Sequence, residues 1–229
     1  MKDWKFAFIH TLPVMFGYVF LGIAFGILMA QAGYGVWWSL AASALIFAGS
    51  MQFLMVELLT GGAGLLLTAA MTFLLNSRHL FYGLSFIEKF RSLGKERHYM
   101  IFSLTDETYS VLCSLTDEES TPSRMTKIAL MDQCWWVLGS VIGGIIGTHL
   151  PFDTTGIDFS MTALFVVILI EQILSAKTRL PIVMGLASSL VFLLLLGPDK
   201  FILPSLIVTV AMLLGARGTI EARLGGASA

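Results

Sequence analysis

Long apolar runs separated by short polar or glycine-rich segments dominate the sequence. The run between Lys5 and Glu57 contains no Asp, Glu, Lys or Arg. A helix needs about 20 residues to cross a ~30 Å hydrocarbon layer, so this run is long enough for two crossings. Backbone hydrogen bonds inside a bilayer must be satisfied internally, which indicates helices. The pattern predicts helices over about 11–31, 37–60, 63–87, 98–115, 127–149, 159–176, 180–197 and 201–217.

These ranges predict an all-α fold, a polytopic integral membrane helical bundle that forms one domain over residues 1–229. Composition agrees with this, because 13% of the 229 residues are charged against about 25% in an average domain. An ordinary water-soluble fold is therefore excluded, and the lipid bilayer is the expected surrounding. The net charge of -1, without a basic block, gives no support for binding to nucleic acid.

The positions of Lys and Arg predict orientation, because cytoplasmic loops are enriched in both. In the second half they place the C-terminus inside. The loop from Glu88 to Arg97 contains four basic residues, yet eight full crossings would place it outside. It lies inside if residues 98–115 enter and leave on the same side, with seven crossings and the N-terminus outside. Seven and eight membrane helices both stay open, and the charge rule favours seven.

A weak internal repetition agrees with seven crossings. Leu, Gly and Gly of the segment Leu21–Gly26 recur 117 positions later in Leu138–Gly143, although these residue types are common in this chain. With seven crossings, residues 11–115 and 127–217 would have opposite orientations. Such pseudo-repeats would form an inverted repeat, which is typical of many secondary transporters.

Ionisable side chains within apolar helices mark candidate functional positions, since each costs roughly 2.5 to 3.5 kcal/mol on insertion scales. Glu57, Asp132 and Glu171 lie near predicted helix ends, where a side chain can reach the interface. We interpret these three as residues at helix ends whose side chains reach the membrane–water interface. The other acidic and basic residues of the apolar segments form two clusters, Arg78 with His79 and Asp106 with Glu107.

The first cluster offers groups suited to a carboxylate and to a proton. The guanidinium of Arg78 presents a planar fork of donors, and Asn76 and His79 share one helical face. His79 titrates near neutral pH and can carry protons. The alternatives are that Arg78 pairs with Asp106 or Glu107 and holds helices together, and that His79 is a hydrogen-bonded packing residue.

The second cluster places two adjacent acids about 100° apart on a helix, so they cannot share a partner unless the backbone breaks there. One acid would neutralise Arg78, and the other would remain free to bind a proton. A partly solvated helix end is the alternative. Farther upstream, Gly49 and Ser50 indicate either close helix packing or an unwound stretch that binds substrate.

Three motifs in these regions resemble those of the AzlC family, the large subunits of bacterial branched-chain amino acid exporters. The family patterns A-G-x-x-Q-F, R-H-x-x-Y-G and L-T-D-E stand at 48–53, 78–83 and 104–107, in the family's order. The resemblance extends over nearly the whole chain. It implies a multi-pass protein of the bacterial inner membrane that exports branched-chain and methionine-like amino acids, driven by protons, with a small AzlD-type membrane subunit.

We assign roles within this resemblance on chemical grounds. Substrate binding is assigned to Gly49, Ser50, Gln52, Phe53, Asn76 and Arg78. Proton coupling is assigned to Glu107, then Asp106 and His79. A non-transporting membrane scaffold is the alternative function.

We expect no enzyme activity, cofactor or metal. An intramembrane hydrolase lacks support, because H-E-x-x-H and G-x-S-x-G motifs do not occur. ATP use lacks support as well, because there is no G-x-x-x-x-G-K-[ST] loop. Cys113 and Cys134 have no metal-ligand spacing and are expected to be free, buried thiols.

Overall fold

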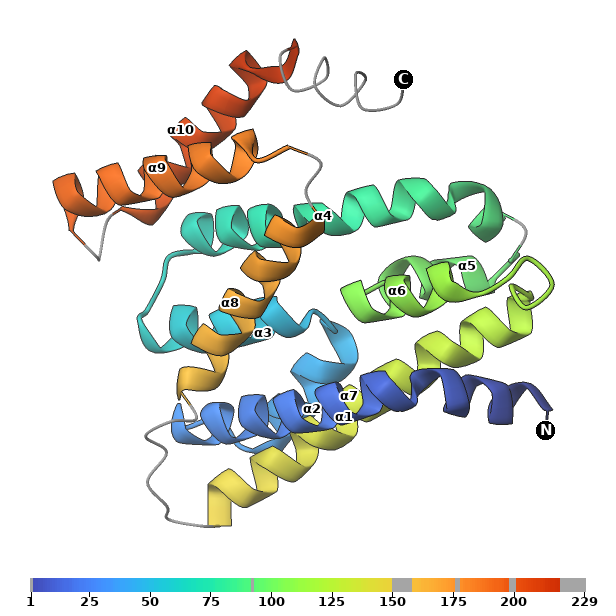
Figure 1. The fold of residues 1–229 in the computed structure, drawn as a ribbon. Coiled ribbons are helices and arrows are strands. Elements are labelled where there is room, and N and C mark those ends of the chain that lie inside the picture. Colours follow the sequence, from blue (N-terminus) through green and yellow to red (C-terminus); the bar gives the residue numbers. More distant parts are fainter. Residues whose placement is uncertain (1, 92, 150–157, 176–177, 198–200, 219–229) are drawn as a thin grey trace. The chain divides into compact units, whose positions relative to one another are not determined.

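The computed structural model describes residues 2–91, 93–149, 158–175, 178–197 and 201–218, in which each regular element is an α-helix. The chain divides into two compact units, residues 1–163 and 164–229. Two described helices, α1 and α7, are long and apolar enough by themselves to cross a membrane. The helices are α1 (Lys2–Gln31), α2 (Val36–Leu45), α3 (Gly49–Thr60), α4 (Leu65–Arg91), α5 (Glu96–Phe102), α6 (Asp106–Ser114), α7 (Pro122–His149), α8 (Asp158–Ser175), α9 (Leu180–Leu196) and α10 (Ile202–Gly215) (Figure 1).

Helices α1 and α7 of the first unit cross in close contact (Figure 1). Glycines line both sides of this crossing: Gly22 and Gly26 on α1, Gly139 and Gly143 on α7. A Cβ atom built on Gly139 would lie 2.6 Å from the carbonyl oxygen of Val19, so the backbones leave no room for side chains. The two glycine pairs that repeat in the sequence therefore pack against each other.

Residues 37–60, which the hydrophobic pattern predicts as one helix, form α2 and α3 instead. The break contains Phe47, whose φ of 46° is in the left-handed region that a bulky residue rarely adopts. Leu28 at the end of α1 and Val56 near the end of α3 line one pocket. The pair therefore returns to the end of the unit where it began. The prediction of one helix is wrong because hydropathy shows an apolar segment but not its direction.

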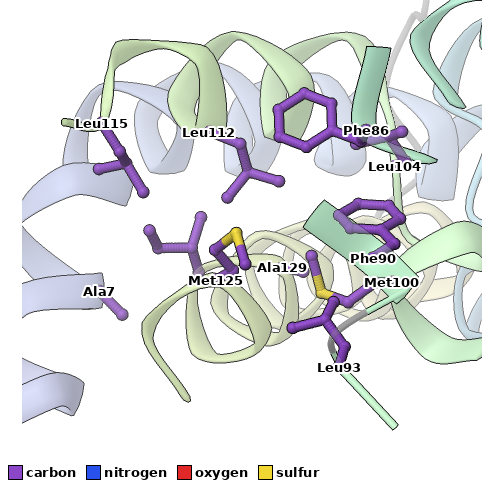
Figure 2. Close-up of a cluster of buried hydrophobic side chains, with 11 residues drawn as sticks. Ala7, Phe86, Phe90, Leu93, Met100, Leu104, Leu112, Leu115, Met125 and Ala129 are labelled. Carbon is purple, nitrogen blue, oxygen red and sulfur yellow. The ribbon is translucent and has the colours of Figure 1, made fainter. Parts of the chain in front are cut away.

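Residues 98–115 also form two helices, α5 and α6, which are separated by Ser103–Thr105. A cluster of buried side chains joins the end of α4, both of these helices, and the beginnings of α1 and α7 (Figure 2). Helix α6 therefore ends close to where α5 begins, as expected for a segment that enters and leaves on the same side. The cluster contains Ala7, Phe86, Phe90, Leu93, Met100, Leu104, Leu112, Leu115, Met125, Ile128 and Ala129.

The two helix pairs that turn back, α2–α3 and α5–α6, begin at opposite ends of the first unit, and their breaks meet between the ends. The rings of Phe47 and Phe102 lie 6.3 Å apart, centroid to centroid. The ring of Tyr18 lies 6.2 Å from that of Phe47. A long helix followed by an interrupted one thus occurs twice within residues 2–114. This differs from the predicted repeat of 11–115 and 127–217, which stays a prediction.

The N-terminal end of α1 lies beside the beginning of α7. Asp3 accepts from Arg124 Nε at 3.4 Å and from Lys127 Nζ at 3.3 Å, and Ala7 belongs to the cluster that contains the end of α4. The N-terminus and the Glu88–Arg97 loop therefore share one end of the unit. The prediction that they lie on opposite sides is wrong, because α2–α3 turns back instead of crossing.

This end of the unit also carries the basic residues, which predicts that it faces the cytoplasm. In a variant with Cys113 and Cys134 replaced by Ser, a cysteine at Lys95 should resist an impermeant thiol reagent in intact cells and react after permeabilisation. A cysteine at Gly64 should react in intact cells, because the position is exposed with nothing within 4 Å of a Cβ atom. The reverse labelling pattern would contradict this orientation.

The other helix ranges lie close to the predicted ones, except that α1 begins at Lys2 rather than near 11 and α7 begins at Pro122 rather than near 127. In the second unit α9 packs on α10, where Ser188 Oγ donates to the Ser205 carbonyl oxygen at 2.8 Å. Cys113 and Cys134 are free thiols as expected, but both are exposed rather than buried. The side chain of Glu171 lies outside the described residues.

Candidate functional site

Gln52 is the centre of the hydrogen bonds at the first helix break. It is completely buried. Its Oε1 accepts from the Ala48 backbone N–H at 3.2 Å and from Trp136 Nε1 at 2.9 Å, and its Nε2 donates to Ser43 Oγ at 3.2 Å. The side chain thus joins α2, the first turn of α3 and α7.

Two further hydrogen bonds tie α2 to α7. Ser43 Oγ donates to Ser140 Oγ at 2.7 Å, and Gln133 Nε2 donates to the Ala44 carbonyl oxygen at 2.9 Å. An interrupted helix leaves backbone polar groups without helical partners. At membrane depth such groups are tolerated only where protein or a cavity supplies partners. Here Gln133 of α7 donates to the Ala44 carbonyl oxygen, and Gln52 of α3 accepts from the Ala48 N–H.

The other residues predicted around Gln52 lie in the first turns of α3. A Cβ atom at Gly49 would lie 3.2 Å from Trp136 Cη2, Ser50 is buried, and Phe53 is completely buried. The ring of Phe53 packs against Phe25 at 6.0 Å. The N-terminus of α3 therefore combines backbone N–H groups at the positive end of a helix with an aromatic wall.

A continuous chain of five polar side chains runs through the second break. Tyr18 Oη donates to Glu107 Oε2 at 2.7 Å and contacts Thr105 Oγ1 at 2.7 Å. Thr105 Oγ1 donates to Thr108 Oγ1 at 3.1 Å, and Thr108 Oγ1 donates to Asp132 Oδ2 at 2.9 Å. We call these five residues the carboxyl chain, because a carboxyl group stands at each end.

Asp132 is completely buried. Helix α7 begins at Pro122, so Asp132 lies roughly 15 Å along it. The interpretation of Asp132 as bordering a helix end is wrong, because the helix begins five residues earlier than the hydrophobic pattern indicates. Its Oδ1 has no hydrogen-bond partner among the described residues, which is costly for an ionised carboxylate.

Among the described contacts, Asp106 and Glu107 have different partners. His79 Nε2 lies 3.9 Å from Asp106 Oδ1, whereas Glu107 contacts Tyr18 on α1. Thr105 caps α6 by accepting the Thr108 backbone N–H at 3.3 Å. The three residues predicted to couple protons therefore surround the beginning of α6.

Helix α4 carries the remaining predicted residues. Asn76 has a buried Oδ1 without a hydrogen-bond partner in the described part of the chain. The side chain of Arg78 lies outside the described residues, so its pairing with Asp106 or Glu107 stays a prediction. In the described ranges, no three His, Cys, Asp or Glu side chains converge to hold a metal ion.

A pocket of about 460 Å³ opens between the C-terminal halves of α1 and α3. Its wall includes Leu28, Phe53 and Val56, and its polar groups include Gln31 and Glu57. Drug-sized ligands occupy cavities of ~300–1,000 Å³, so the volume suffices for a small molecule. Phe53 connects this pocket to the first turns of α3.

Six residues of these networks are not predicted from the sequence, and each is an uncharged polar or aromatic residue in an apolar helix: Tyr18, Ser43, Thr108, Gln133, Trp136 and Ser140. Tyr18 and Ser43 lie in the uncharged run between Lys5 and Glu57, where nothing in the sequence distinguishes them from packing residues. Trp136 resembles an interfacial aromatic residue. Thr108 directly follows the L-T-D-E motif, which is the signal that could have identified it.

The comparison with sequence families matches the AzlC protein family to residues 13–150, more than half of the chain. The chain belongs to the AzlC family. The matched range contains both helix breaks, the Gln52 hydrogen bonds and the whole carboxyl chain. The features described above are therefore located in the AzlC region.

Several curated proteins are similar to most of the chain. The branched-chain amino acid transport protein AzlC of Bacillus subtilis is 37% identical over 94% of this chain and 85% of its own length. An uncharacterized membrane protein of Haemophilus influenzae is 36% identical over 89% and 84%. The inner membrane protein YgaZ of Escherichia coli is 28% identical over 71% and 70%. No solved structure matches the chain.

Proposed function

We propose that this protein is a secondary transporter that exports branched-chain amino acids across the bacterial inner membrane. One observation carries the proposal: two helix pairs that turn back begin at opposite ends of the first unit and meet at buried polar side chains. Interrupted helices that meet at membrane depth form the substrate and ion sites of many transporters. The transport protein of Bacillus subtilis supports the choice of amino acids as substrates.

The first break offers what a zwitterionic amino acid requires. The backbone N–H groups of Gly49 and Ser50 at the N-terminus of α3 suit a carboxylate. On α4, the buried Oδ1 of Asn76 has no hydrogen-bond partner among the described residues and suits an ammonium group. Phe53 offers an apolar surface for the side chain of valine, leucine or isoleucine. Arg78 is our further candidate for the substrate carboxylate.

Coupling to protons is assigned to the second break, with Glu107 as the principal group and Asp106 and His79 beside it. The breaks lie close enough for one to affect the other, because Tyr18 contacts both Glu107 and the ring of Trp136, at 5.3 Å between centroids. Trp136 in turn donates to Gln52. We further propose a small AzlD-type membrane subunit as the partner.

Vesicles test the proposal directly. The full chain is reconstituted with and without the small membrane subunit, and labelled leucine, methionine and lysine are followed under an imposed pH gradient. Accumulation of leucine but not lysine supports the proposal. If leucine accumulates only in the presence of the subunit, the two proteins together form the transporter. Transport by the subunit without this chain would favour the scaffold and refute the proposal.

Gln52→Ala should weaken leucine binding by about tenfold, because three buried groups lose their common partner and α3 loses its fixed position. Binding of labelled leucine to purified protein measures this. Gln133→Ala is the control, since it removes another amide that ties α2 to α7 but leaves α3 in place. Equal losses in the two variants would show that general loosening, and not the position of α3, is responsible.

A further inference from the structure

If both of its acids are ionised, the carboxyl chain has one hydrogen atom fewer than its contacts require. Four contacts link its five residues: Glu107–Tyr18, Tyr18–Thr105, Thr105–Thr108 and Thr108–Asp132. A hydroxyl group has one hydrogen to donate, and an ionised carboxylate has none. With both acids ionised, three hydroxyl hydrogens must serve four contacts, and one contact is left without a hydrogen.

One added proton removes this deficit. If it is bound by Asp132, each group donates to the next in the order Asp132, Thr108, Thr105, Tyr18, Glu107. If it is bound by Glu107, every donor reverses. The two arrangements contain the same atoms and total charge, and they interconvert when each hydroxyl passes its hydrogen to the next oxygen. No other reactant is needed.

The surroundings of the two ends differ. Glu107 is partly exposed, whereas Asp132 is completely buried with one oxygen unpartnered among the described residues. Among the described residues of the neighbouring helices, the titratable groups near Asp132 are Glu107 from α6, Tyr18 from α1 and Tyr99 from α5. None of these is a cation, so the described surroundings favour a neutral Asp132.

We propose that Glu107 and Asp132 share a single transported proton through the hydroxyl groups of Tyr18, Thr105 and Thr108, with Asp132 as the inner binding position. The proton reaches α7 one helical turn from Trp136, the residue that holds Gln52 and the first turn of α3. This inference rests on the proposed function for its role in transport. The existence of the shared proton does not depend on leucine.

Infrared spectra of the purified full-length chain, recorded across a pH titration, test the shared proton without any substrate. We expect a carboxylic acid C=O band that Asp132→Asn removes. Thr108→Val, which keeps the shape but loses the hydroxyl, should shift the band, and Thr108→Ser should restore it. Tyr18→Phe should also shift the band. Tyr99→Phe is the control, because the Tyr99 hydroxyl donates to Gln133 and makes none of the four contacts of the carboxyl chain.

Transport measurements in reconstituted vesicles then test whether the carboxyl chain takes part in proton-coupled transport. Proton movement coupled to leucine should fall about tenfold or more in Tyr18→Phe and Thr108→Val, while leucine exchange continues. A band insensitive to Asp132→Asn, or to both Thr108→Val and Tyr18→Phe, overturns the shared proton. A wild-type protein that shows the band but moves no leucine refutes the proposed function and leaves the shared proton supported.

Discussion

Gly143→Leu should eliminate the folded protein. A Cβ atom at this position would overlap the backbone carbonyl oxygen of Ile23, which cannot move without separating α1 from α7. Ordinary overpacking costs about 1–3 kcal/mol, and an entire domain has only about 5–15 kcal/mol of stability. Forcing α1 and α7 apart should cost more free energy than such ordinary overpacking. Size-exclusion chromatography of detergent extracts should show loss of the monodisperse peak.

Gly17→Leu is the matched control for this substitution. Gly17 lies on α1, and nothing is within 4 Å of a Cβ atom there. The same added side chain should therefore leave the peak largely unchanged. Normal behaviour of Gly143→Leu would show that α1 and α7 do not pack at this distance.

Glu107→Gln should abolish proton-driven leucine accumulation and preserve leucine exchange. The amide has nearly the shape of the carboxyl group and still accepts from Tyr18, but it cannot bind and release a proton. A gradient of one pH unit corresponds to about 1.4 kcal/mol, enough for about tenfold accumulation at one proton per leucine. We expect this accumulation to disappear in vesicles of the variant.

Glu88→Gln controls for the loss of a carboxylate in general, because Glu88 is exposed near the end of α4. It should accumulate leucine like the unaltered protein. Glu107→Gln vesicles that still concentrate leucine under a pH gradient would show that Glu107 is not the coupling site. Loss of exchange as well as accumulation would place Glu107 in substrate binding instead.

The sequence predicts the helical class, most helix ranges and the AzlC family, because each depends on local pattern. Apolar runs set where helices form, and three motifs in register indicate the family. The expectation that Asp106 and Glu107 face different partners also followed from local geometry. The predicted substrate and coupling roles of the site residues stay predictions.

Whether each apolar segment crosses the first unit or turns back could not be predicted from the local sequence pattern. Residues 37–60 have the length and hydropathy of a crossing, and only contacts with distant segments show that they turn back at Phe47. Asp132 was misjudged for a related reason. Its position within the helix depends on residues 122–126, whose polar character conceals the true beginning of α7.

The ties between α2 and α7 also set an order of events during synthesis. Ser43 and Ser140 are 97 residues apart. A ribosome that adds about 5–20 residues per second needs roughly 5 to 20 s to make the intervening chain. Throughout this interval the break at Phe47 has no α7 to receive its polar groups. The α2–α3 pair can therefore reach its final depth only after α7 has entered the membrane, so the nascent protein completes this part of its fold late.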